Sequence, residues 1–134
     1  MTKAKSTEIT KGLKALFIIH GVGALVSGLI YFLVPLKWAE FSNYGPTDHV
    51  FVRYFGAVTL ALSFKDWICL RAKSWMEVRI IVMMEVVWTL LATLLGLYLV
   101  LFAVLTAPVS LIWFNIVTFA AFFIAWTYFY VKYR

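Results

Sequence analysis

The dominant pattern along the chain is four long apolar stretches separated by short polar or proline-containing breaks. A helix needs roughly 20 apolar residues to cross a lipid bilayer, and each stretch reaches that length. We therefore expect one all-α domain, a four-helix transmembrane bundle, over residues 1–134. Its helices are predicted at about residues 13–34, 49–70, 76–105 and 109–131.

The breaks carry residues that end or begin helices. Pro35 follows the first apolar stretch, and proline cannot continue a helix. Ser74 and Glu77 have the spacing of a capping box, so the third helix should start near Trp75. The breaks thus agree with the hydropathy pattern on where the first helix ends and where the third begins.

The longest connection is the predicted outer loop, residues 35–48. Its first residue is proline, which favours a short helix there. Leu36, Trp38 and Phe41 would then suit burial at the interface between lipid and water. Two interpretations are open: a structural re-entry turn, and a lid over an outward-facing pocket.

Basic residues gather on one side of the predicted bundle. Of the 12 Lys and Arg residues, all except Lys37 and Arg53 lie before the first helix, around the second connection or at the end of the chain. The positive-inside rule then places both termini in the cytoplasm and predicts a multi-pass protein of the cell membrane. Tyrosine and tryptophan residues near both predicted membrane surfaces agree with this orientation.

The composition supports a membrane protein and argues against nucleic-acid binding. The chain is 64% hydrophobic and 13% charged, whereas soluble domains are about half apolar and about a quarter charged. A chain of 134 residues cannot hide this excess in a soluble core, so lipid must cover it. The net charge is +6, but the basic residues lie at the predicted helix ends and form no patch between aromatic residues of the kind that binds nucleic acid.

Each predicted helix has one face of small and polar residues, and such faces pack closely in membranes. The other faces are rich in Leu, Val, Ile and Phe, which suit lipid or a partner subunit. The glycines predicted to lie at helix contacts are Gly23, Gly28, Gly56 and Gly96.

Three ionisable residues, His20, Asp66 and Glu85, fall on these small-residue faces and at similar depth in the inner half of the membrane. We therefore expect them to meet. Ionisable groups inside a membrane are costly, and two neighbouring carboxylates tend to share a proton. Two interpretations are open: a structural network in which Asp66 pairs with Lys65 or Arg79, and a functional site for a proton, a cation or a small amphiphile.

Three residues are predicted to be interfacial anchors: Arg53, Lys65 and Trp38. Lys65 adjoins Asp66, but adjacent residues on a helix point about 100° apart. We therefore expect its long side chain to extend to the cytoplasmic headgroups. Arg53 is expected either to lie beside lipid phosphate or to meet Asn115.

The motif content argues against an ordinary enzyme. His20 and His49 lie at opposite membrane depths, so they cannot supply paired axial ligands to a haem. Cys69 is the single cysteine and can form neither an internal disulfide nor a thiolate metal site. The sequence contains no phosphate-binding loop and no nucleophile elbow. We predict no cofactor and no metal.

The chain resembles a broad set of small prokaryotic four-helix membrane proteins, with a distant similarity to DoxX-like proteins. The features that carry this resemblance are a glycine-rich first helix that ends at Pro35 and the segment RYFGAVTLALS at residues 53–63. The resemblance implies the four-helix fold and no catalytic residues. In size and helix count the chain also resembles the small multidrug transporters, but where their first helix has an essential glutamate this chain has His20.

Two functions fit these features. The first is a non-enzymatic accessory or structural subunit that packs against other membrane-protein subunits, since its loops are short and its outer faces resemble lipid. The alternative is a small, self-associating carrier or binder of a proton-coupled or amphiphilic ligand, which would use His20, Asp66 and Glu85.

Overall fold

The computed structural model describes residues 8–42, 48–102 and 109–134, and its regular structure is helical. No sheet forms among these residues; an isolated antiparallel bridge joins Glu8 to Ser74. The helices are α1 (Lys11–Leu33), α2 (Pro35–Phe41), α3 (His49–Cys69), α4 (Trp75–Phe102) and α5 (Val109–Tyr133).

Among the described residues, three helices are long and apolar enough to cross a membrane: α1, α4 and the Ser110–Tyr133 part of α5. The chain therefore has the features of a multi-pass membrane protein. The helix α3 has a similar length, 21 residues, but it carries three charged residues, Arg53, Lys65 and Asp66. The helix α4 also has three charged residues, but they lie in its first half, whereas those of α3 lie toward both of its ends and interrupt its apolar stretch.

Local chemistry explains where the helices begin. Asp48 precedes α3 and its carboxylate accepts a hydrogen bond from the backbone nitrogen of Val50 at 2.8 Å. The backbone nitrogen of Ser74 donates to Glu77 Oε1 at 3.1 Å, which is the reciprocal bond of the predicted capping box.

The observed helix ends lie within three residues of the predicted ones, and the starts of α3 and α5 match the prediction. The largest difference is at α4, which was expected to reach residue 105 and ends at Phe102. Residues 103–108, which include the proline-containing break between the third and fourth predicted helices, lie outside the described residues. The short helix expected in the outer loop is α2, while residues 43–47 of that loop also lie outside the described residues.

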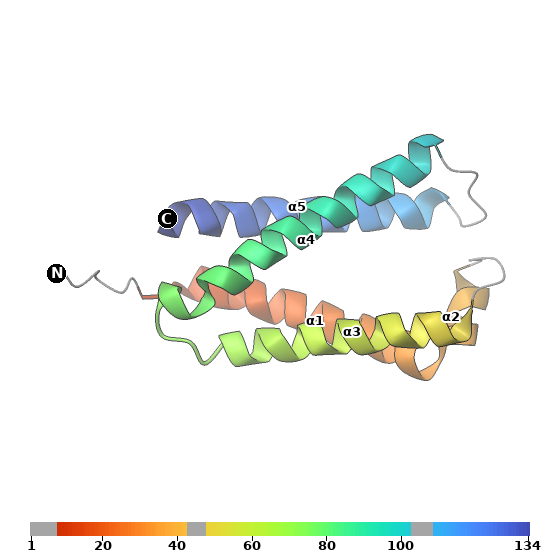
Figure 1. Cartoon of the computed structure of the whole chain (residues 1–134), viewed down its shortest axis with the longest axis horizontal. Coiled ribbons are helices and arrows are strands. Elements are labelled where there is room, and N and C mark those ends of the chain that lie inside the picture. The colour runs from red at the N-terminus through yellow and green to blue at the C-terminus, as the bar shows by residue number, and fades with distance from the viewer. Residues whose placement is uncertain (1–7, 43–47, 103–108) are drawn as a thin grey trace.

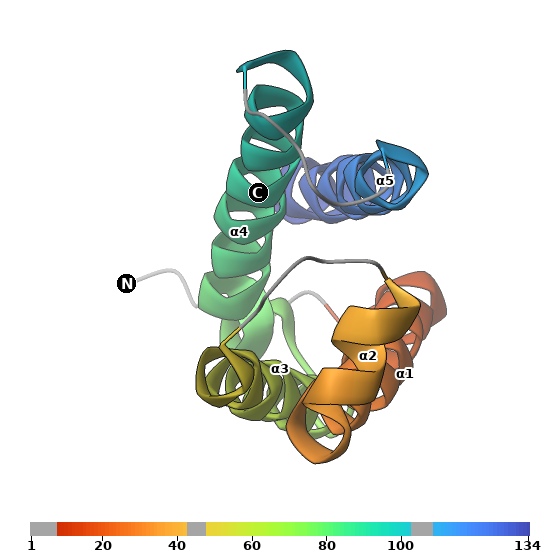
Figure 2. The same ribbon diagram turned by 90° about the vertical axis from the view of Figure 1, so that its right-hand side faces the viewer.

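The four long helices form two antiparallel pairs (Figure 1). We call α1 and α3 the first helix pair, and α4 and α5 the second helix pair. The two pairs lie close together at the end where α1 begins and α5 ends, and there the backbone nitrogen of Thr10 donates to the hydroxyl of Tyr133 at 2.8 Å. Toward its other end, α4 turns away from the first helix pair (Figures 1 and 2).

The main core lies at the end where all four long helices meet. Trp126 of α5 is fully buried, and its ring centroid lies 5.0 Å from that of Phe17 of α1. Trp75 of α4 stacks on Tyr133 of α5 at 5.1 Å. The contact of Phe17 with Trp126 holds the two pairs together at this end, and the Trp75–Tyr133 stack joins the two helices of the second pair.

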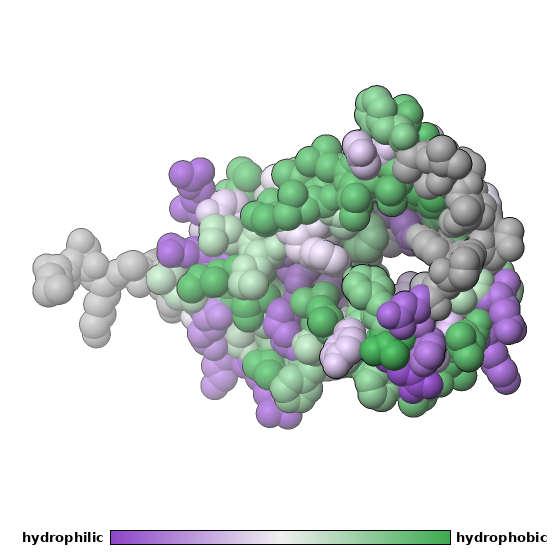
Figure 3. Space-filling view, turned by 45° about the vertical axis from the view of Figure 1, so that its right-hand side comes forward, coloured by the Kyte–Doolittle hydropathy of each residue, from purple (hydrophilic) through white to green (hydrophobic). Residues whose placement is uncertain are grey.

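The outside of the molecule is largely apolar. Figure 3 shows hydrophobic residues over most of the second helix pair. Large side chains such as Leu101, Phe102 and Phe114 are 66–74% exposed. A monomeric soluble protein rarely exposes so much apolar surface, so these faces fit contact with lipid.

Two of the predicted packing glycines lie where α1 and α3 approach closely. A Cβ atom added to Gly56 would lie 2.6 Å from the backbone nitrogen of Phe32. One added to Gly28 would lie 2.9 Å from Cγ of Leu60. The close approach of the first helix pair therefore requires the absence of a side chain at both positions.

The other two predicted glycines differ from each other. Gly96 lies against α5, where an added Cβ would come within 2.6 Å of Ile116 Cγ1. The prediction for Gly23 is wrong, because no described atom of a neighbouring element lies within 4 Å of a Cβ added there. Gly21 takes this role instead, with Asp66 Cβ at 3.1 Å. Two residues turn a helix by about 200°, which places Gly23 on the outer face.

We expect Gly56→Leu to lower the free energy of unfolding by about 1–3 kcal/mol, the usual cost of overpacking. The atom it would meet belongs to the backbone of Phe32 and cannot rotate away. Gly23→Leu is the matched control, since it makes the same chemical change on an open face of α1. Thermal melts of the detergent-solubilised chain measure both, and equal losses would contradict the close contact at Gly56.

Candidate functional site

The structure brings together the three ionisable residues singled out by the sequence. His20 lies on α1, Asp66 on α3 and Glu85 on α4, and one nitrogen or oxygen atom from each lies within 4.8 Å of the others. All three are buried, with 7%, 0% and 2% of their surface exposed. The site thus joins the first helix pair to the second.

Lys65 is the fourth member of the site. Its Nζ lies 2.9 Å from Asp66 Oδ1 and also donates a hydrogen bond to Glu85 Oε1. The expectation that Lys65 extends to the cytoplasmic headgroups is therefore wrong. Two carboxylates buried side by side would be strongly destabilising without a cation, and the flexible lysine stem can reach them. We call His20, Lys65, Asp66 and Glu85 the charge network.

His20 connects the two carboxylates. Its Nδ1 lies 2.6 Å from Asp66 Oδ2, where an N–H can donate to the carboxylate. Its Nε2 faces Glu85 Oε2 across 3.5 Å, slightly beyond ordinary hydrogen-bond length. Glu85 Oε2 has no hydrogen-bond partner among the described residues. An additional proton could therefore form a hydrogen bond between His20 and Glu85.

The local sequence explains why Asp66 can approach α1. The absence of a side chain at Gly21 leaves room for Asp66, whose Cβ would otherwise meet the Cβ of residue 21 at 3.1 Å. One turn earlier on α3, the hydroxyl of Ser63 donates to the carbonyl of Gly21 at 2.8 Å. This bond holds the two helices together beside the network.

Aromatic residues of α5 shield the imidazole. The ring of His20 meets Phe122 edge-to-face at 5.0 Å and Trp126 at 5.8 Å. Trp126 is fully buried. Water is thus excluded from this side of the network, where the electrostatic interactions among its charged groups are stronger than in water.

The donor atoms of His20, Asp66 and Glu85 are of the types that bind divalent metal ions. The ammonium group of Lys65 already contacts both carboxylates. A metal ion would therefore have to displace Lys65. The geometry therefore favours the ammonium group of Lys65 as the cation beside the two carboxylates.

The two other predicted anchors lie outside the charge network. Arg53 donates from Nη1 to the carbonyl of Phe32 at 3.1 Å. That carbonyl belongs to the last turn of α1, whose carbonyls have no partner within the helix. The ring of Trp38 packs against Tyr31, with 5.4 Å between centroids. Both residues thus join the first helix pair and α2 at the predicted outer end.

The comparisons with known proteins add no relative. The resemblance to small prokaryotic four-helix membrane proteins remains a prediction, and the function must be argued from the residues and their geometry. No protein-family model, no curated protein and no solved structure matches the chain.

Proposed function

We propose that the chain is a non-enzymatic, four-span protein of the cell membrane that binds an exchangeable proton at the charge network and couples it to an amphiphilic ligand. In this proposal both termini are cytoplasmic and the protein works as a small carrier or binder. The observation that supports it most is that two buried carboxylates, a buried histidine and a half-buried lysine come together where three long helices meet. Ionisable groups inside a membrane are costly and are functional candidates for that reason.

The fourth crossing in this proposal is α3. Its 21 residues span roughly 30 Å, the thickness of the hydrocarbon core. Each of its charged side chains has a partner: Lys65 and Asp66 within the network, and Arg53 at the carbonyl of Phe32. These partners reduce the cost of placing α3 in lipid, and its antiparallel packing on α1 fits a helix that returns across the membrane.

A count of charges supports a proton site. Asp66 and Glu85 contribute two negative charges when ionised, and Lys65 contributes one positive charge. The network becomes neutral when one more proton is bound, and His20 and Glu85 face each other where that proton would lie. Because a net charge in a buried site is costly, this proton should stabilise the arrangement seen in the structure.

The position of the network suggests how a proton would affect a ligand. His20, Lys65 and Asp66 belong to the first helix pair and Glu85 belongs to the second. Loss of the proton would weaken the attraction between His20 and Glu85 and favour another arrangement of the two pairs. A ligand that prefers one arrangement would then bind with an affinity that depends on pH.

Binding of a lipophilic cation tests the proposal. Equilibrium dialysis of tetraphenylphosphonium against the detergent-solubilised full chain at pH 6 and pH 8 should show affinities that differ by about fivefold or more, a usual size for coupled binding. Equal affinities at the two pH values, or no saturable binding, would contradict the carrier function.

Topology is a second expected result. Reporter domains fused after Arg134 and within residues 71–73 should both be cytoplasmic, and one inserted directly after Ser42 should be external. The reason is the distribution of basic residues together with four crossings. Protease protection in sealed vesicles measures all three, and a cytoplasmic result for the reporter after Ser42 would contradict the crossing of α3 or the orientation.

A specific observation also favours the accessory-subunit function. The splayed second helix pair carries large exposed apolar side chains at its predicted outer end, among them Leu101 and Phe102. A neighbouring subunit would cover such a face as well as lipid does. Purification in mild detergent should then yield stoichiometric partner proteins, whereas a homo-oligomer alone would favour the carrier.

A further inference from the structure

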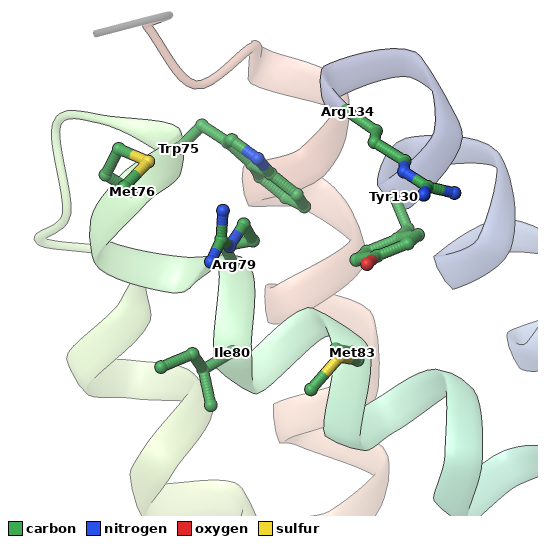
Figure 4. A pocket seen from close by; sticks show the side chains of 7 residues that line it. All are labelled: Trp75, Met76, Arg79, Ile80, Met83, Tyr130 and Arg134. Carbon is green, nitrogen blue, oxygen red and sulfur yellow. The ribbon is translucent and has the colours of Figure 1, made fainter. Parts of the chain in front are cut away.

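A second polar site lies at the end of the molecule opposite the outer loop, apart from the charge network. It is a groove of about 280 Å³ between the start of α4 and the end of α5. Figure 4 shows Arg79 from α4 on one side and Arg134 with Tyr130 from the end of α5 on the other, and the ring of Trp75 extends between the two sides. We call it the arginine groove.

Within the part of the chain that the structure describes, no acidic side chain pairs with either arginine. Both side chains are exposed, and among residues 8–42, 48–102 and 109–134 neither guanidinium has an ion pair or a hydrogen bond. The nearest acidic residue along α4, Glu77, instead accepts hydrogen bonds from Ser74. The groove therefore carries two positive charges that are available to an anion.

The walls of the groove suit the membrane interface. Trp75 is 5% exposed and is held by stacking on Tyr133, so it forms a fixed surface. Tyr130 lies edge-to-face with Trp75 at 6.2 Å. Tryptophan and tyrosine favour the headgroup level of a bilayer. If these aromatic residues lie at that level, the arginines beside them are at the level of the lipid phosphates.

An apolar track leads away from the arginines. Ile80 and Met83 line the groove further along α4, and they are 63% and 45% exposed. The spacing of three residues places them on one face of the helix. A molecule with an anionic head at the arginines could lay an acyl chain along this face.

We propose that the arginine groove binds the phosphate headgroup of an anionic membrane lipid. The planar guanidinium groups of Arg79 and Arg134 donate to the phosphate oxygens, and Ile80 and Met83 contact the first part of an acyl chain. The site rests on the orientation proposed above, which places the start of α4 at the cytoplasmic surface. It does not depend on the proton bound by the charge network.

Native mass spectrometry of the full chain in detergent, with equal amounts of phosphatidylglycerol and phosphatidylcholine, tests this site. We expect the full chain to bind phosphatidylglycerol in preference to phosphatidylcholine. In Arg79→Gln/Arg134→Gln this preference should fall about tenfold, because the charge-assisted hydrogen bonds to the phosphate are lost. Arg71→Gln/Lys132→Gln removes the same charge from exposed positions outside the groove and should keep the preference. Equal losses of lipid preference in the two double variants would overturn the site and would indicate that any positive charge on the surface attracts the anionic lipid.

A second arm separates the lipid from free phosphate. Soluble glycerol phosphate at the same concentration should not displace bound phosphatidylglycerol, because it lacks the acyl chain that Ile80 and Met83 contact. Full displacement would overturn a lipid site in favour of a free phosphate site. Glu85→Gln should leave the lipid preference unchanged, so a failure of the proton site and a failure of the arginine groove give different results.

Discussion

Replacing Lys65 with methionine is expected to lower the free energy of unfolding by about 3–5 kcal/mol, the cost of breaking a buried ion pair. Methionine has a similar length but no charge, so Asp66 and Glu85 would face each other without their shared cation. Thermal or denaturant melts of the detergent-solubilised chain measure the loss. Few other single substitutions should cost as much.

A double variant shows whether charge causes this loss. Lys65→Met/Glu85→Gln removes one positive and one negative charge, so the net charge of the network is unchanged. We expect it to recover more than half of the stability lost in Lys65→Met. Lys73→Met, on the exposed connection between α3 and α4, is the control and should change stability by less than about 0.5 kcal/mol. A small effect of Lys65→Met would mean that the ammonium group does not hold the two carboxylates together.

The second large effect is expected from Glu85→Gln. Glutamine has the shape of glutamate and can still accept from Lys65, but it cannot take up a proton. The pH dependence of tetraphenylphosphonium binding should therefore disappear while the chain stays folded. The variant Glu77→Gln, on an exposed turn at the start of α4, should keep that dependence.

These outcomes separate a structural network from a functional one. If the network only fixes helix order, Glu85→Gln changes stability and leaves any pH dependence as it was. If the network binds the coupled proton, the pH dependence is lost at nearly unchanged stability. Normal pH dependence in Glu85→Gln would remove Glu85 from the proposed proton site.

The sequence was sufficient to predict that His20, Asp66 and Glu85 meet. Helical periodicity gives the face of each residue, and its distance from the basic helix ends gives its depth. Both quantities are local to one helix and require no knowledge of how the helices pair. The all-α class and the short helix after Pro35 followed from equally local signals.

The position of Lys65 could not be obtained in this way. A lysine near a helix end can extend to water or turn inward, and the choice depends on the charges it meets. Here two carboxylates from different helices draw it inward. The adjacent Asp66 indicated that Lys65 could turn inward. That interpretation also required Glu85, 20 residues further along the chain, to lie nearby.

The hydropathy pattern also could not predict which glycines are buried or which helices pair. Gly21 and Gly23 lie close together in the sequence, and only the packing of α1 on α3 decides which one is buried. The pairing of α1 with α3 and of α4 with α5, and the divergence of the two pairs, depends on side-chain fit among several helices. The arginine groove arises from that arrangement, since it joins residues 79 and 134.

The most direct test of the proton site is the protonation of His20 observed by nuclear magnetic resonance. The chain has two histidines, His20 in the network and His49 exposed at the start of α3. Labelling histidine with nitrogen-15 therefore reports on His20, with His49 as an internal reference. We predict that the pH titration of the His20 ring nitrogens changes in Glu85→Gln while that of His49 does not. Identical His20 titrations in the two proteins would contradict a proton shared between His20 and Glu85.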